Sequence, residues 1–450
     1  MLSSRLPKDL SPSPFFAELE RAKASAKKDA ADGGLPFIDM TVSSPVKAGL
    51  PIDLDAAVDE GRESFGCWNP DAAGWKSARE AVVEYYRERG GNFTAGQIIL
   101  TASTSEAYSV LFKTFCDPGD VILTPMPGYP LLDTLAQLEH LECAPYFLKL
   151  QREKKKKILA LVRRRSPQVA GMTSGVDFRF ILDTDSLLAA PEKAKILLLV
   201  SPHNPTGHCV SREEWNASVR FCEENNMILV VDEVFGDYGF SPEVRRSWEY
   251  LMGGKRDPRL RGNDSGRESL WDAGGADFVN LPEDGPKCPI FWLNGLSKAV
   301  GSPQLKLGWM AFYAPRERFE EIRAALEFVE DAYLSVSAPA QALGTALLKQ
   351  SAAYESRVKE RLLQNWQTLR EAFPAKYCPT VLGGWYAVVR LGEDDEELTL
   401  RLLKEKHVLV QPGFFFDFDE DGWVVISLLQ EPAQFKEAIA RMSFLYITRG

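Results

Sequence analysis

The chain has 450 residues, a hydrophobic fraction of 45% and a formal net charge of −10. This acidic balance argues against nucleic acid as the main partner. The sequence has no run of about 18 apolar residues that could cross a membrane, and no apolar core of a signal peptide near its start. Seven scattered cysteines suit a reducing compartment, so we expect a cytoplasmic protein. No metal site is expected, because His203 and His208 have no third ligand nearby.

We expect the first 50 residues to form an irregular arm. A short amphipathic helix is predicted over 18–28, and the stretch 37–50, FIDMTVSSPVKAGL, is rich in turn residues. Apolar residues at helical spacing then predict a helix over 78–89.

A strand over 98–100 leads directly into the small residues of 101–105, and a helix is predicted from Glu106 onward. Small residues at a helix N-terminus let backbone amides approach an anion, and the helix dipole favours negative charge there. Ser103, Thr104 and Ser105 are therefore candidates to hold a phosphate group, and ordinary helix capping is the alternative.

Three further apolar stretches end in polar residues. The stretch 121–138 predicts a strand, a turn that contains Tyr129, and a helix. The apolar run 193–207 ends in a turn at Asn204, and the apolar run in 227–238 ends at Asp232. This alternation predicts an α/β fold, a mostly parallel sheet flanked by helices. Ligands bind at the carboxyl ends of such strands.

Two stretches read as insertions. Eight Lys or Arg residues fall between Arg152 and Arg165, inside the stretch 151–177. A basic run can bind nucleic acid or acidic lipid, but no aromatic residue interleaves this one, and we favour a solvated insertion. The second insertion, 252–287, is rich in Gly, Asp and Arg and has no period.

Lys298 is the residue around which we expect the site to form. It follows a buried strand, CPIFWLNG, and Gly295, Gly301 and Gly308 break the regular pattern, which predicts a turn at a strand end. A lysine there can form a Schiff base with a carbonyl group, the chemistry of pyridoxal phosphate enzymes. A second cation, Lys306, could neutralise a phosphate.

These motifs occur in the order found in class I and II aminotransferases, and the chain resembles this family of fold-type I pyridoxal 5′-phosphate (PLP) enzymes over roughly residues 37–445. The resemblance implies a large cofactor-binding domain covered by a smaller α+β domain. We accordingly expect an arm and substrate-side segment at 1–50, a large domain at 51–325 and a small domain at 326–450. Relatives are homodimers with shared active sites, so a homodimer is expected.

The resemblance also implies a role for each motif residue. Lys298 would bind the cofactor, and Asp232 would keep the pyridine nitrogen protonated, so that the ring acts as an electron sink. The residues implied to bind PLP are Ser103, Thr104, Ser105, Ser297 and Lys306 at the phosphate, Tyr129 on the ring face and Asn204 at the ring oxygen.

Three positions depart from the family pattern. Val425 stands where relatives carry the arginine that grips the substrate carboxylate, and Phe235 replaces a tyrosine that donates to the ring oxygen. Trp68 replaces a tyrosine that reaches the cofactor phosphate of the neighbouring subunit. Arg390 is a candidate substitute for the missing arginine, and a surface position is the alternative. A substrate that lacks the carboxylate is a further possibility.

The resemblance implies transfer of an amino group between an amino acid and a 2-oxo acid, in amino-acid metabolism or biosynthesis. Two alternatives stay open. Lyases and decarboxylases of the same fold share these cofactor motifs. The missing arginine and the two insertions are also compatible with a non-catalytic PLP-binding regulatory protein. The sequence does not identify the amino donor or acceptor.

Overall fold

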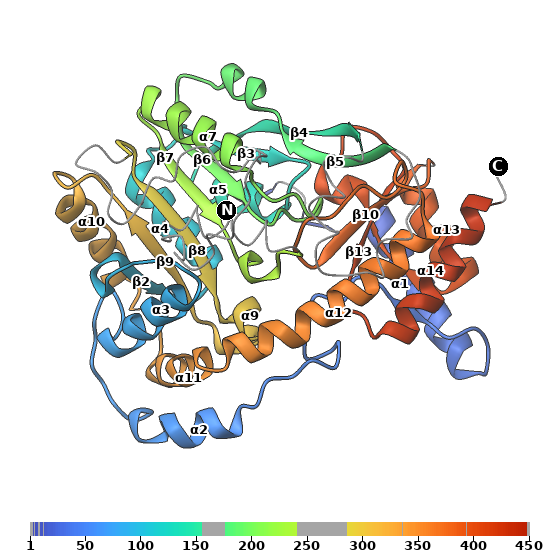
Figure 1. Ribbon diagram of the computed structural model, residues 1–450, viewed down its shortest axis with the longest axis horizontal. Helices are drawn as coiled ribbons and strands as arrows, with labels where there is room; N and C mark the ends of the chain where they lie inside the picture. Colours follow the sequence, from blue (N-terminus) through green and yellow to red (C-terminus); the bar gives the residue numbers. More distant parts are fainter. Residues whose placement is uncertain are drawn as a thin grey trace, which may run out of the picture.

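A computed structural model describes residues 3, 5–7, 10–11, 13–154, 176–240, 286–334, 336–392 and 394–447 of the chain. Its centre is an eight-stranded sheet in which β9 and β5 run against the other strands (Figure 1). In spatial order the strands are β2 (Ile98–Thr101), β9 (Gly308–Tyr313), β8 (Ile290–Gly295), β7 (Ile228–Asp232), β6 (Ala194–Val200), β3 (Val121–Met126), β4 (Glu142–Lys154) and β5 (Val176–Leu182). The predicted mostly parallel sheet is confirmed.

Helices cover both faces of this sheet. One face packs against α4 (Thr104–Phe115), α5 (Leu131–Leu138) and α10 (Phe319–Asp331). The other face packs against α3 (Lys76–Glu88), α7 (Arg212–Glu224) and α11 (Ala338–Leu348). Because alternate residues of each central strand enter one core or the other, these strands are apolar throughout, as in parallel sheets buried on both sides.

A smaller unit follows in the chain. Its antiparallel sheet has the order β10 (Tyr386–Arg390), β13 (Trp423–Ser427), β12 (Gln411–Pro412), flanked by α13 (Asp395–Lys406) and α14 (Pro432–Ile447). Within it, β11 (Val408–Leu409) pairs with β1 (Ile38–Asp39) of the N-terminal segment, and α1 (Pro14–Ala31) packs on α13. The long helix α12 (Ser351–Ala372) extends from beside α9 (Leu296–Ala299) to α14, and α2 (Asp55–Gly61) lies against α11 (Figure 1).

Several predicted elements need correction. Helical periodicity in the sequence predicts a long helical stretch over 339–373, and the structure divides this stretch into two helices, α11 and α12. The sequence also predicts a helix over 314–331, and that helix begins only at Phe319. The predicted insertion 151–177 is strand at both of its ends, where β4 and β5 pair antiparallel. Its central part, 155–175, and all but the last two residues of 252–287 lie outside the described residues.

Candidate active site

The predicted phosphate cup lies at the start of α4, directly after β2. Ser103 is the N-cap, and its hydroxyl accepts the Glu106 N–H at 3.2 Å. The helix begins at Thr104, two residues earlier than predicted, so Thr104 and Ser105 occupy its first turn. Backbone amides of a first helical turn have no partner within the helix, which makes this end suited to an anion.

Two glycines bring Lys298 and Lys306 to this cup. A side chain on Gly308 would lie 3.0 Å from the Ser103 carbonyl carbon, and one on Gly295 would lie 2.9 Å from the Gly308 Cα. Without side chains, β8, β9 and the start of α4 approach closely enough to share one corner. Lys306 follows in this corner with a left-handed backbone and an exposed side chain, two residues before Gly308.

Lys298 lies on α9, a single helical turn at the end of β8, where the sequence predicted an irregular turn. Its Nζ atom is 4.7 Å from the centre of the Trp385 ring and 5.6 Å from that of Phe235. Burial among these rings lowers the pKa of Lys298 to about 8, and the charge of Asp232 opposes the shift. The hydroxyl of Tyr238 donates to the Lys298 carbonyl oxygen at 2.6 Å and so fixes the backbone that carries the amine.

Asp232 ends β7, beside β8, as the parallel pairing predicted. Burial raises the pKa of its carboxyl group, and hydrogen bonds from Tyr108 and the Val234 N–H, together with the charge of Lys298, oppose that shift. Burial raises the pKa of Tyr129, and the charge of Asp232 adds to this shift. Tyr129 lies just before α5 and is half-exposed, so one of its ring faces is available for stacking.

Asn204 lies in the turn after β6, the strand next to β7. Its Oδ1 atom is buried and has no hydrogen-bond partner among the residues that the structure describes. This turn packs against the segment before Trp385, because Leu382 and Gly383 both donate to the Gly207 carbonyl oxygen. The Asn204 side chain therefore lies in the region of Trp385 and Lys298, with its amide oxygen unpaired.

Sequence reasoning missed three aromatic residues of this site, Trp385, Tyr386 and Tyr108. Trp385 and Phe235 lie beside the lysine amine, the Tyr386 ring is 5.9 Å from the Phe235 ring, and Tyr108 donates to Asp232. Phe235 was identified only as a departure from the family, and the others were assigned to no role. The helical spacing of α4 offered one signal, since Thr104 and Tyr108 are one turn apart and share a face.

The predicted substitute clamp lies elsewhere. Val425 is buried in β13, opposite Val388 of β10 and Gln411 of β12. Arg390 is at the far end of β10 from Trp385, where its guanidinium pairs with Glu420 and lies over the Trp423 ring. Arg390 is thus the surface arginine of the alternative interpretation.

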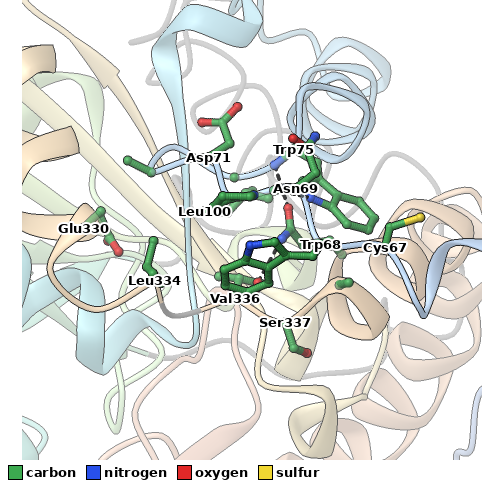
Figure 2. A pocket seen from close by; sticks show the side chains of 15 residues that line it. Cys67, Trp68, Asn69, Asp71, Trp75, Leu100, Glu330, Leu334, Val336 and Ser337 are labelled. Carbon is green, nitrogen blue, oxygen red and sulfur yellow. Dashed lines mark hydrogen bonds between the residues drawn. The ribbon is translucent and has the colours of Figure 1, made fainter.

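Trp68 lies on the surface with 80% of its area exposed. It lines a pocket of about 280 Å³ together with Cys67, Leu334 and Ser337 (Figure 2). Gln341 also lines the pocket. Its side-chain oxygen accepts the backbone N–H of Trp75 at 2.6 Å, and its side-chain nitrogen donates to the Val336 carbonyl oxygen at 2.9 Å.

Two further searches cover only the described parts of the chain. No helix there is long and apolar enough to cross a membrane. No three His, Cys, Asp or Glu side chains within these ranges are grouped so that they could hold a metal ion.

The sheet, its two helical layers and a half-buried lysine near an acid at strand ends define a fold-type I PLP enzyme. The sequence model of the family described as aminotransferase class I and II matches residues 68–442. The chain belongs to this family, whose members use PLP to transfer amino groups, and this protein is a PLP-dependent aminotransferase.

Curated relatives and solved structures agree with this assignment. Glutamate-pyruvate aminotransferase AlaA of Haemophilus influenzae is 23% identical over 391 residues, which cover 83% of this chain and 81% of the relative. Alanine aminotransferase of Mycobacterium tuberculosis is 24% identical over 386 residues, which cover 83% of this chain and 76% of the relative. The structure of alanine aminotransferase from Pyrococcus furiosus superposes with a TM-score of 0.70 at 20% identity, covering 97% of this chain and 100% of that one. The lyase, decarboxylase and regulatory alternatives receive no support from these relatives.

The residues present fit the cofactor. The close approach of Gly308 to Ser103 leaves the first turn of α4 beside Lys306, which suits a phosphate. The side-chain N–H of Asn204 can donate to the ring oxygen, and the half-buried carboxylate of Asp232 suits a protonated ring nitrogen.

Proposed function

We propose that Lys298 is the residue that binds the PLP carbonyl group and that Asp232 faces the ring nitrogen. The observation that carries this assignment is the Lys298 amine itself, which lies beside two aromatic rings near the half-buried carboxylate of Asp232, with its pKa lowered to about 8. When bound, PLP supplies a carbonyl that condenses with amines and a ring that withdraws electrons.

The lowered pKa has a chemical consequence for Lys298. A larger fraction of its amine is neutral near neutral pH, and only a neutral amine can attack a carbonyl or accept a proton. In the proposed reaction the Lys298 Nζ atom would accept the proton from the substrate Cα and would donate it to the carbon that came from the cofactor's carbonyl group. Ser103, Thr104, Ser105, Ser297 and Lys306 hold the phosphate meanwhile, Tyr129 covers one ring face, and Asn204 donates to the ring oxygen.

Borohydride trapping tests the assignment of Lys298. The PLP-loaded protein is reduced, digested and mapped by mass spectrometry, and we expect the pyridoxyl label on the peptide that contains Lys298. Lys298→Ala should lose this label, while the control Lys306→Ala should keep it and bind PLP more weakly. A label on another lysine, or an unchanged label in Lys298→Ala, would overturn the assignment.

The donor and acceptor are best sought with a panel of amino acids. Amino transfer requires that 2-oxo acid production depends on an added 2-oxo acid acceptor. Release of pyruvate or carbon dioxide without an acceptor would instead support lyase or decarboxylase chemistry.

We further infer that the substrate is an amino acid whose carboxylate is held by hydroxyl groups. The Tyr386 ring lies 5.9 Å from the Phe235 ring; burial and the charge of Tyr129 raise the pKa of Tyr386, and the Ser43 hydroxyl opposes that shift. Hydrogen bonds from neutral donors to a charged acceptor are worth about 1.5–3 kcal/mol each. Tyr386→Phe should therefore raise KM for the best amino acid by at least about tenfold with a smaller change in kcat. An unchanged KM would contradict this assignment.

A second copy of the chain is proposed to cover the pocket at Trp68. The indole is too exposed to serve the core of its own subunit, and the family resemblance gives this position to a residue that reaches the partner subunit's cofactor. An indole N–H can donate to a phosphate, although it cannot accept. We also propose a cytoplasmic location, which the free thiol state of all seven cysteines supports.

A further inference from the structure

Tyr108 is a buried tyrosine that no sequence motif singled out. It lies on α4, one turn beyond the phosphate cup, and is 4% exposed. Its hydroxyl donates to the Asp232 Oδ2 atom at 2.6 Å. One rigid helix thus carries both the N-terminal amides of the cup and a donor to the acid at the end of β7.

The contacts of Asp232 divide between its two oxygens. Oδ1 accepts the Val234 N–H at 3.1 Å, and Oδ2 accepts the Tyr108 hydroxyl. The first contact comes from the chain just after Asp232, whereas the second comes from a separate element. Tyr108, which lies on α4, therefore fixes the rotation of the Asp232 carboxylate about its Cβ–Cγ bond.

The ionisable groups near this carboxylate act in opposite directions. Burial favours the neutral acid, whereas the Tyr108 hydroxyl and Lys298 favour the anion. Burial raises the pKa of Glu233, the next residue, which favours its neutral form. Asp232 is therefore not forced to share the site with a second carboxylate anion. Tyr129 is near enough for the Asp232 charge to raise its pKa, and burial and the same charge raise that of Tyr108.

We propose that Tyr108 is a positioning residue that holds Asp232 as an oriented anion, so that the proton between this acid and the cofactor ring stays on the ring nitrogen. The proposal rests on the assignment of Asp232 to the ring nitrogen under Proposed function. A carboxylate that loses a donor becomes more basic, and it then competes with the pyridine nitrogen for their shared proton. Tyr108 therefore sets the strength of the electron sink without touching the cofactor.

The size of the effect follows from ordinary hydrogen-bond strength. A hydrogen bond to a charged group corresponds to about one to two pKa units of differential interaction. Loss of the Tyr108 hydroxyl should therefore shift the proton balance between Asp232 and the ring nitrogen by about tenfold or more.

The test is Tyr108→Phe, with the protonation of the ring read directly. The protein is loaded with PLP labelled with ¹⁵N in the ring, and the ¹⁵N chemical shift is followed between pH 6 and pH 9. We expect the wild-type resonance to report a protonated nitrogen, and the variant resonance to move toward the neutral value. A smaller loss in kcat than in Asp232→Asn should accompany it.

Tyr146→Phe is the matched control. Tyr146 is also a buried tyrosine, and its hydroxyl donates to the Leu198 carbonyl oxygen at 2.9 Å rather than to an acid. This change removes a buried hydrogen bond of similar length but should leave the ¹⁵N shift at the wild-type value. An unmoved resonance in Tyr108→Phe, or an equal displacement in Tyr146→Phe, would overturn the proposal.

Two more measurements separate the possible failures. If Asp232→Asn also leaves the ¹⁵N shift unchanged, the assignment of Asp232 itself fails. If only Tyr108→Phe leaves it unchanged, the assignment stands and the role of Tyr108 fails. Should Tyr108→Phe not fold, 3-fluorotyrosine at position 108 keeps the shape and makes the hydroxyl a stronger donor. The ¹⁵N shift should then move further toward the protonated value, and movement toward the neutral value would contradict the proposal.

Discussion

Replacing Lys298 by methionine should make the cofactor-free protein more stable at neutral pH. Methionine has a similar length and no charge, so it can occupy the space between Trp385 and Phe235 without desolvating an ammonium group. The variant should lose all aminotransferase activity. Lys298→Met would thus separate the contribution of the lysine to activity from its effect on the free energy of unfolding.

The magnitude follows from the shift in the pKa of Lys298. The pKa is lowered from 10.5 to about 8 on folding, and each pKa unit corresponds to about 1.36 kcal/mol. Below pH 8 the amine is protonated in both the folded and unfolded states, and the folded state carries the full penalty. Above pH 10.5 the amine is neutral in both states, and the penalty vanishes. The full shift is worth about 3 kcal/mol, and because Lys298 is partly exposed we expect about 2–3 kcal/mol.

Urea denaturation of the two apoproteins at several pH values measures this difference. The free energy of unfolding of Lys298→Met should exceed that of the wild type by about 2–3 kcal/mol at pH 7, and the excess should shrink between pH 8 and pH 10. Lys436→Met, on the exposed face of α14, is the control and should give a difference near zero at every pH. A variant that is less stable at pH 7, or a difference that does not change with pH, would refute the reasoning.

Two other substitutions test the buried network and the proposed dimer. Arg89 contacts Asp237 at 2.5 Å and Glu355 at 3.3 Å, and Glu355 also pairs with Lys359. Arg89→Met should therefore leave buried Asp237 without a cation and lower the free energy of unfolding by about 3–5 kcal/mol in urea titrations. A loss below about 1 kcal/mol would contradict this. Trp68→Glu should shift the sedimentation coefficient toward the monomer and weaken PLP binding, and an unchanged dimer would show that Trp68 lies outside the subunit interface.

The strands of the large domain could be predicted because their burial on both faces leaves a continuous apolar signal. The runs before Asn204, Asp232 and Lys298 became β6, β7 and β8, in parallel register. Their carboxyl ends then had to meet at one edge of the sheet. The position of these residues at one site therefore followed from the pattern of the chain.

Short or interrupted helices were harder to predict. α9 has only four residues, too few to show a helical period, so Lys298 was predicted on an irregular turn. The break between α11 and α12 was missed for a related reason. It contains neither Gly nor Pro, and the apolar period continues on both sides of Lys349 and Gln350.

Contacts between distant elements left even weaker traces in the sequence. Tyr108 occupies an ordinary core position of α4, and only the packing of α4 against β7 reveals that its hydroxyl meets Asp232. Trp385 directly precedes β10 of the smaller unit, and only the fold brings its ring within 4.7 Å of the Lys298 amine. Arg390 was the converse case: strand pairing placed it near Val425, but its side chain points to Glu420.

Under the proposed assignment of Asp232, the acids after β7 explain how the chain would keep one carboxylate for the cofactor. Asp237 accepts hydrogen bonds from Arg89 and from the Tyr85 hydroxyl at 2.9 Å, so its charge is balanced by a cation. Glu233 accepts the Tyr86 hydroxyl at 2.6 Å, and burial raises its pKa, which favours its neutral form.

Asp232 differs from both neighbours. Its hydrogen bonds come from neutral donors, and Lys298 is the positive group that acts on it within the described residues. That lysine gives up its free ammonium charge when it binds a carbonyl group. A protonated ring nitrogen can then supply the positive charge beside the Asp232 carboxylate. Loss of Asp232 or of its Tyr108 hydrogen bond should therefore change the protonation of the ring nitrogen more than the stability of the fold.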